Sequence, residues 1–125
     1  MITFEEIDKS EVVDKYKNCF DEDVRYFKVI KGKCILCIYG LVSRGNKVIE
    51  TFWVTESFHN RVFTKSFFVS LFKHAFSLGY TELYTWTRWE KLIDVFGHFK
   101  SFGIEKTECP PWDKDETKTW FIKRI

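Results

Sequence analysis

Residues 51–104 decide the fold, and they open with the apolar run Thr51-Phe52-Trp53-Val54-Thr55. A turn holding Arg61 follows, and then a helix rich in phenylalanine, a second strand over residues 82–86 and a further helix before Phe102-Gly103-Ile104. A chain uses the order strand, basic loop, helix, strand, helix to separate two parallel strands and direct a helix N-terminus at a bound anion. The order therefore predicts an α/β domain with an anion-binding loop after the first of these strands.

The composition fits one globular domain. With 125 residues the chain is long enough for a substantial core, so we expect a single domain over residues 1–125. Hydrophobic residues make up 45% and charged residues 30%, which argues against extended disorder. No apolar run approaches the roughly 18–20 residues of a membrane span, and the N-terminus lacks a signal-peptide pattern. We expect a cytoplasmic protein that is not secreted and does not bind a membrane.

Charge and cysteine spacing argue against nucleic acid and metal. The 20 basic and 18 acidic side chains are spread along the chain, without the basic stripe that duplex DNA requires. Cys34 and Cys37 form a C-x2-C pair, but no further ligands stand at matched spacing. The pair also lies in an apparent strand, where residues three apart point to opposite faces. We therefore expect buried free cysteines, no metal and no nucleic-acid partner.

Hydrophobic periodicity predicts the element order α-β-β-β-α-β-α-β-β. Asp8-Lys9-Ser10-Glu11 has the pattern of a capping box, which predicts a helix to about Phe20. Three antiparallel strands should follow, over residues 26–30, 34–42 and 48–55. Apolar residues at three- and four-residue spacing from Phe63 predict a helix that ends at Gly79. The later elements are a strand over 80–86, a helix opened by Thr87-Arg88-Trp89-Glu90, and strands over 104–108 and 117–122. We expect a mixed α/β sheet with helices on its faces.

This order resembles the GNAT family of N-acetyltransferases, whose central strand separates from its neighbour to admit acetyl-coenzyme A. Trp53-Val54-Thr55 is similar to the end of that strand. Arg61-Val62-Phe63-Thr64-Lys65-Ser66 stands in the place of the pyrophosphate loop, written Gln/Arg-x-x-Gly-x-Gly/Ala. Phe99-Lys100-Ser101-Phe102-Gly103-Ile104 resembles the closing Tyr-x-x-x-Gly-Phe. The similarity in layout covers residues 29–122. The chain also resembles small GNAT-like internal virion proteins of short-tailed phages.

The resemblance implies an acetyl-coenzyme A site, although its loop departs from the family pattern. The implied binding residues are Trp53, Val54, Thr55, Arg61, Thr64, Lys65 and Ser66. Thr64 replaces a glycine where the backbone should approach the pyrophosphate closely. The hydroxyls of Thr64 and Ser66 and the ammonium of Lys65 could contact phosphate directly. Alternatively, Thr64 caps the helix, and Arg61 and Lys65 form a solvated basic turn.

The acid–base residues also depart from the family. Phe99 stands where the family has a tyrosine as general acid, and it cannot donate a proton. A base that deprotonates the substrate amine must then come from elsewhere, and Glu50 and Glu56 are the candidates. His98 could replace the missing acid. Alternatively, Glu50 is a polar residue on a half-exposed strand, and His98 is an exposed histidine of a helix.

Two functions therefore remain open. In one, acetyl-coenzyme A-dependent N-acyltransferase activity is weak or lost, and the protein is a binding or structural component, with a virion protein or a host factor as partner. The missing glycine and tyrosine favour this reading, which would place the protein in the cytoplasm of a bacterial host or in a virion. In the other, it is an active N-acetyltransferase on an amine, which Arg61 and the intact layout favour. Trp53, Trp86, Trp89 and Trp112 should meet near the separated strands, as pocket wall, contact surface or core.

Overall fold

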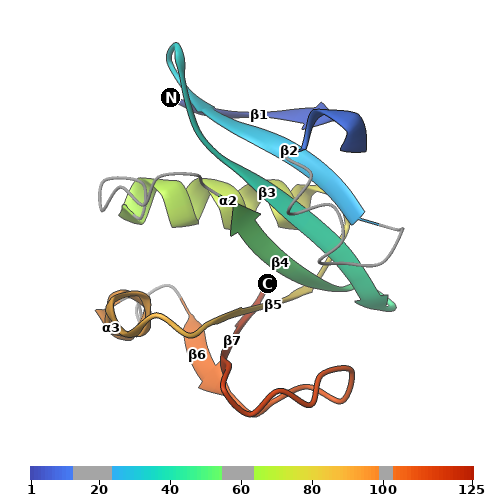
Figure 1. Ribbon diagram of the computed structural model, residues 1–125, viewed down its shortest axis with the longest axis vertical. Coiled ribbons are helices and arrows are strands. Elements are labelled where there is room, and N and C mark those ends of the chain that lie inside the picture. Colours follow the sequence, from blue (N-terminus) through green and yellow to red (C-terminus); the bar gives the residue numbers. More distant parts are fainter. Residues whose placement is uncertain (13–23, 55–63, 99–102) are drawn as a thin grey trace.

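A seven-stranded mixed sheet forms the centre of the computed structural model, which describes residues 1–12, 24–54, 64–98 and 103–125 (Figure 1). Neighbouring strands follow the order β1-β2-β3-β4-β5-β7-β6. In chain order the elements are β1 (Ile2–Ile7), the 3-10 turn η1 (Lys9–Glu11), β2 (Val24–Lys31), β3 (Cys34–Gly45), β4 (Val48–Val54), α2 (Lys65–Ser77), β5 (Glu82–Thr87), α3 (Glu90–His98), β6 (Ile104–Thr107) and β7 (Thr119–Arg124).

Strand pairing divides the sheet into two antiparallel groups. Strands β1 to β4 form the first group, and β5, β7 and β6 form the second. A parallel contact between β4 and β5 joins them. The predicted mixed α/β sheet with helices is therefore confirmed, as is the antiparallel pairing of the strands predicted within residues 26–55.

The N-terminal segment differs from the prediction. Residues 2–7 form strand β1 at the edge of the sheet, whereas the sequence interpretation began the order with a helix. Strand β1 is held there partly by Phe4, whose ring stacks on that of His74 in α2 with centroids 4.3 Å apart. The capping box of Asp8 and Glu11 is present, but it opens the short turn η1. Residues 13–20 of the predicted helix lie outside the described residues.

The two α-helices pack against the same face of the sheet. One buried cluster contains residues of both helices and inward residues of strands β2 to β7. The helix residues in it include Phe67, Phe68 and Leu71 of α2 and Leu92 and Phe96 of α3. The rings of Phe68 and Phe96 lie 5.1 Å apart, so the two helices contact each other over the sheet. Helix α2 follows the predicted periodicity, and Gly79 with φ +100° comes directly after its end, as predicted.

The opposite face carries a second cluster, which contains Tyr26, Val42 and Phe52. The far end of the Phe52 ring lies over Gly40 of the neighbouring strand, where a Cβ atom would meet the ring at 2.2 Å. Residues 108–118, the loop between β6 and β7, cover the part of this face formed by β4, β5 and β7, as the contacts of Trp112 show. The two faces of the sheet therefore differ: helices cover one, and this loop covers part of the other.

Candidate functional site

Strands β4 and β5 separate after a short parallel contact. They pair through Val48–Glu82, Ile49–Leu83 and Glu50–Tyr84. Beyond Glu50, β4 continues to Val54 beside β3, and β5 continues to Thr87 beside β7. Figure 1 shows β4 and β5 running apart. Among the described residues, the edge of 51–54 that faces β5 and the edge of 85–87 that faces β4 pair with no strand. Their backbone N–H and C=O groups are therefore available to an extended ligand. We call this gap the split.

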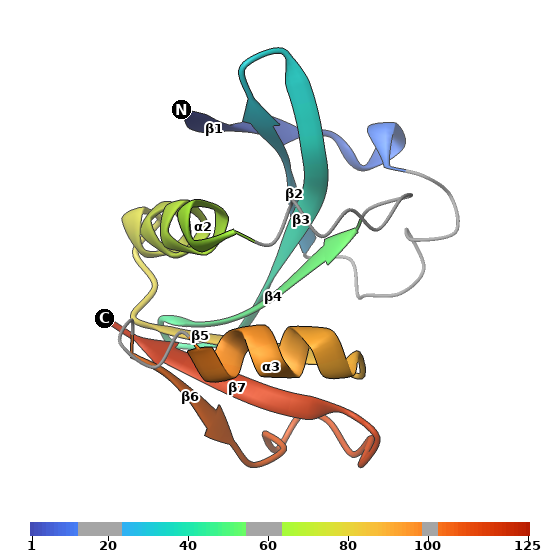
Figure 2. The same ribbon diagram turned by 90° about the vertical axis from the view of Figure 1, so that its left-hand side faces the viewer.

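The N-terminus of α2 begins on the side of the molecule where β4 and β5 end (Figure 2). Thr64 is its N-cap, and the Thr64 hydroxyl accepts a hydrogen bond from Phe67 N–H at 3.2 Å. Lys65 and Ser66 follow in the exposed first turn. The capping role of Thr64 is thus confirmed, whereas phosphate contacts by Lys65 and Ser66 remain predictions. A helix start has unpaired N–H groups and a partial positive charge, both of which suit an anion.

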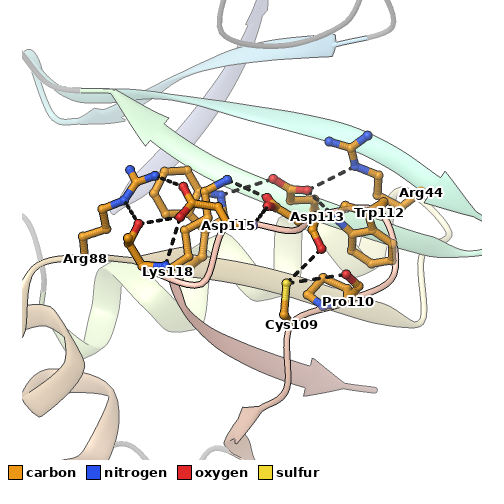
Figure 3. A network of polar contacts seen from close by, with 11 residues as sticks. Arg44, Arg88, Cys109, Pro110, Trp112, Asp113, Asp115 and Lys118 are labelled. Atoms are coloured by element: carbon orange, nitrogen blue, oxygen red, sulfur yellow. Dashed lines mark hydrogen bonds and ion pairs between the residues drawn. The ribbon is translucent and has the colours of Figure 1, made fainter.

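On the face opposite the helices, Glu50 lies at the last residue pair before the split. Its side chain is buried, with only 1% of the residue exposed. Its Oε1 accepts hydrogen bonds from Arg44 Nε at 3.1 Å and Trp112 Nε1 at 2.8 Å, and its Oε2 accepts one from Trp86 Nε1 at 3.3 Å (Figure 3). Both carboxylate oxygens are therefore engaged by donors of this chain. Such bonds stabilise the buried negative charge.

The loop of residues 108–118 brings Trp112 to Glu50, and ion pairs hold the loop in place (Figure 3). Lys118 Nζ lies 2.6 Å from an Asp113 carboxylate oxygen, and the Cys109 thiol donates to the Asp113 carbonyl at 3.0 Å. Arg88, just after β5, pairs with Asp115 and donates to the Thr117 hydroxyl at 2.7 Å. The loop is therefore anchored both within itself and to the end of β5.

Protonation of the loop carboxylates follows from these bonds. The Thr117 hydroxyl and N–H, and then the Arg88 guanidinium, lower the pKa of Asp115 to about 2. Burial raises the pKa of Asp113, but the hydrogen bonds from Lys118 and from backbone N–H groups outweigh it, and the net pKa is lowered. Both loop aspartates are thus ionised at neutral pH.

Aromatic rings surround Glu50 and carry cations on their faces. Trp112 packs edge-on against Tyr84 at 5.0 Å and Trp120 at 6.2 Å. Lys118 Nζ lies 4.1 Å from the centre of the Trp86 ring, a cation–π distance. The expected meeting of Trp86 and Trp112 near the separated strands is confirmed. Trp89 instead packs against the core on the helix side, and the side chain of Trp53 is outside the described ones.

The remaining predicted site residues lie at the end of β4, at the end of α3 or outside the described residues. Trp53 and Val54 are the last residues of β4, opposite Tyr39 and Ile38 of β3. His98 is the exposed last residue of α3, and Figure 2 shows that end of the helix on the far side from the diverging strand ends. Of the acid–base candidates the structure describes, Glu50 alone lies at the split. Thr55, Glu56, Arg61 and Phe99 lie outside the described residues.

Sequence reasoning missed two hydroxyls beside the split. Thr51 and Thr85 each directly follow the last β4–β5 pair and are 0% and 3% exposed. Among the described residues, the buried side-chain N and O atoms without a hydrogen-bond partner are Thr51 Oγ1, Thr85 Oγ1 and Trp120 Nε1. The only sequence signal was a polar residue at an inward position of each strand. Open strand edges, unsatisfied hydroxyls and a helix start together fit an extended ligand with amide groups and an anionic end, as coenzyme A has.

A membrane-spanning helix and a metal site each place requirements on the described residues. No helix there is long and apolar enough to cross a bilayer. Nor do three or more His, Cys, Asp or Glu side chains in residues 1–12, 24–54, 64–98 and 103–125 gather as a metal site would require. Cys34 is exposed and Cys37 is buried, so only Cys37 meets the expectation of a buried free cysteine. Burial raises the pKa of Cys37 to about 12.

Comparison with known proteins identifies the fold. Neither a protein-family model nor a curated protein sequence matches the chain. Among solved structures, an acetyltransferase from Bacillus subtilis in complex with CoA has a TM-score of 0.68 at 12% identity, over 100% of this chain and 99% of that one. An acetyltransferase of the GNAT family from Staphylococcus aureus has a TM-score of 0.61 at 13% identity, over 99% of each chain. The N-acetyltransferase PseH from Campylobacter jejuni has a TM-score of 0.66 at 15% identity, over 98% of this chain and 97% of that one.

The chain therefore has the GNAT fold, and the predicted resemblance in architecture is confirmed. At these identities the likeness concerns the fold. The resemblance to internal virion proteins of phages is not tested by these comparisons and stays a prediction.

Proposed function

We propose that this GNAT-fold protein binds a coenzyme A-type ligand in the split, has weak or no acetyl-transfer activity, and acts as a binding component. The observation that carries the proposal is the environment of Glu50, whose two carboxylate oxygens are occupied by Arg44, Trp86 and Trp112. The proposal has two parts, ligand binding and weak transfer, and each has its own support.

Ligand binding is supported by three features of the split. The open edges of β4 and β5 offer backbone donors and acceptors to an extended chain. The α2 N-terminus offers N–H groups to a phosphate, and the implied binding residues Arg61, Lys65 and Ser66 stand at or before this turn. A solved structure with the same fold contains CoA. Acetyl-coenzyme A would bring a thioester acyl group, and Trp53, Val54 and Thr55 would line its arm.

Weak acetyl transfer is supported by the burial and hydrogen bonding of Glu50, the candidate general base. An amine acceptor attacks a thioester as the free amine, so a group must remove its proton. Glu50 stands at the last residue pair before the split, but it is 1% exposed, and Trp112 of the loop of residues 108–118 donates to it. An amine could reach Glu50 only if side chains that cover it, such as Trp112, moved aside. We therefore expect the protein to hold its ligand without efficient turnover.

A binding component requires a partner. The resemblance to internal virion proteins motivates a virion protein or a host factor, in a bacterial cytoplasm or in a phage particle. The large amphipathic rings around Glu50 are of the residue types enriched at protein contacts.

Calorimetric titration with acetyl-coenzyme A, paired with a thiol-release assay, tests both parts of the proposal. We expect micromolar binding by the wild-type protein, loss of binding in Arg61→Ala, and no thiol release above hydrolysis with polyamines, arylalkylamines or lysine peptides. Absence of binding at millimolar ligand would overturn the ligand assignment. Turnover in the usual enzymatic range of about 1 s⁻¹ or faster would overturn the weak-transfer assignment.

The alternative is an active N-acetyltransferase, and one observation favours it. Glu50 lies at the very residue pair where the strands separate, which is a suitable position for a base. The variant Trp112→Phe removes the 2.8 Å donor to Oε1 but keeps an aromatic ring. If this variant, but not the wild type, releases thiol with an amine, Glu50 is a competent base that the loop restrains.

A further inference from the structure

Two buried hydroxyls flank the split at matching positions. Thr51 follows the Glu50–Tyr84 pair on β4, and Thr85 follows it on β5, so they would face each other if the strands continued to pair. They stand two residues after Ile49 and Leu83, both of which belong to the core on the helix side. Side chains alternate along a strand, so both hydroxyls lie on the face that α2 and α3 cover.

A buried hydroxyl without a partner is rare, because such a group loses its hydrogen bonds to water and gains none in return. Two of the three buried side-chain N and O atoms without partners in the described residues are these hydroxyls. Valine has the same shape and would fill either position without this penalty. The fold alone therefore gives no reason for a threonine at residues 51 and 85.

Thr87 shows that the same strand can satisfy such a group. It lies on the same face of β5 two residues further on and is 7% exposed. Its hydroxyl accepts a hydrogen bond from Trp89 N–H at 3.0 Å. Unsatisfied hydroxyls are thus not a general property of inward threonines in β5. Thr85 differs from Thr87 in directly following the last β4–β5 residue pair, where the split begins.

We propose that the hydroxyls of Thr51 and Thr85 bind the ligand, donating to or accepting from the amide groups of an extended chain that enters between β4 and β5. The pantetheine arm of coenzyme A has this chemistry, with two amides along a narrow chain. The inference rests on the proposed function, since it takes the split as the place of the coenzyme. In the protein without ligand the two hydroxyls stay unsatisfied, and ligand binding supplies their partners.

The test compares isosteric variants in two measurements. Thr51→Val and Thr85→Val remove a hydroxyl and keep the shape, and each should weaken the binding of coenzyme A by about five- to tenfold, the loss of one hydrogen bond. Binding of adenosine 3′,5′-bisphosphate, which lacks the pantetheine arm, should be unchanged. Both variants should melt at the same temperature as the ligand-free wild type or above it, because a buried unsatisfied group is removed.

Two further variants serve as controls. Thr51→Ser and Thr85→Ser keep the hydroxyl and should keep the affinity for coenzyme A within about twofold, so they report on the hydroxyl even if a valine variant folds poorly. Thr87→Val removes a hydroxyl that has a partner, and should lower the melting temperature without ligand, in contrast to Thr51→Val and Thr85→Val.

Three results would overturn the inference. If the wild type binds coenzyme A and both valine variants bind it equally well, the hydroxyls are not ligand groups although the proposed function stands. If the valine variants melt at a clearly lower temperature without ligand, the hydroxyls already have partners. If the wild type does not bind coenzyme A, the ligand assignment under the proposed function fails, and this inference fails with it.

Discussion

Replacing Arg44 with methionine should destabilise the protein by about 2 kcal/mol, because it removes the cation next to the buried Glu50 carboxylate. Breaking a fully buried ion pair costs about 3–5 kcal/mol. We expect less here because the Arg44 side chain is 22% exposed and the two indole donors to Glu50 remain. At about 2.1 cal/mol/K per residue, a loss of this size in 125 residues lowers the melting temperature by about 8 °C.

A double-mutant cycle in urea measures this interaction. Unfolding is followed by tryptophan fluorescence for Arg44→Met, Glu50→Gln and the double variant, with the slope of the transition checked for constancy. The double variant should lose less than the sum of the single variants, with a coupling of about 1 kcal/mol or more. Arg124→Met is the matched control, because its 3.8 Å pair with Glu82 is exposed and should contribute less than about 0.5 kcal/mol. Additive losses, or an Arg44→Met effect no larger than that of the control, would refute this account of Glu50.

Three further predictions follow from local geometry. Gly40→Ala should destabilise the protein by about 1–3 kcal/mol in urea unfolding, since its Cβ would lie 2.2 Å from the Phe52 ring. Gly97→Ala in helix α3, where a Cβ would meet nothing within 4 Å, should instead stabilise the protein by up to about 1 kcal/mol. Equal effects of the two substitutions would contradict this packing. Because the pKa of Asp115 is lowered to about 2, its contribution to stability should be complete above about pH 4 and lost as the pH falls towards 2. An acid titration of unfolding should lose this part of its pH dependence in Asp115→Asn, and an unchanged profile would show that the loop bonds do not act this way. Thr64→Ala should destabilise by about 1 kcal/mol through loss of the helix cap, and Thr64→Ser should restore most of it; a serine variant as unstable as the alanine variant would exclude the cap.

The order of the central elements could be predicted from the sequence because their patterns are local. The phenylalanine spacing that marks α2 and the glycine that ends it depend on residues a few positions apart. Strand β1 was missed because its pattern is weak: the stretch Ile2–Ile7 contains two glutamates and buries only Ile7 fully. Its place at the sheet edge depends on pairing with β2, from Ile7–Tyr26 to Ile2–Lys31, and local periodicity does not reveal a pairing between residues so far apart in the chain.

The candidate site could be predicted only in part for the same reason. Glu50 was identified from its position before the apolar end of β4, but its donors Trp86 and Trp112 lie 36 and 62 residues further along the chain. Their contact depends on how the loop of residues 108–118 folds back, and a loop rich in charge and proline has no periodicity that fixes its path. Thr51 and Thr85 could not be predicted as site residues, because the absence of a hydrogen-bond partner for a buried hydroxyl depends on the folded surroundings of that hydroxyl.

The hydrogen bonds to Glu50 have a spectroscopic consequence. The carboxylate of Glu50, on β4, accepts the indole N–H groups of Trp86, on β5, and Trp112, in the loop after β6, directly beside the three residue pairs that join β4 to β5. A molecule that enters between β4 and β5 beyond these pairs would change the surroundings of the two indoles. The emission of Trp86 and Trp112 should therefore shift on ligand binding, which gives a label-free measure of occupancy.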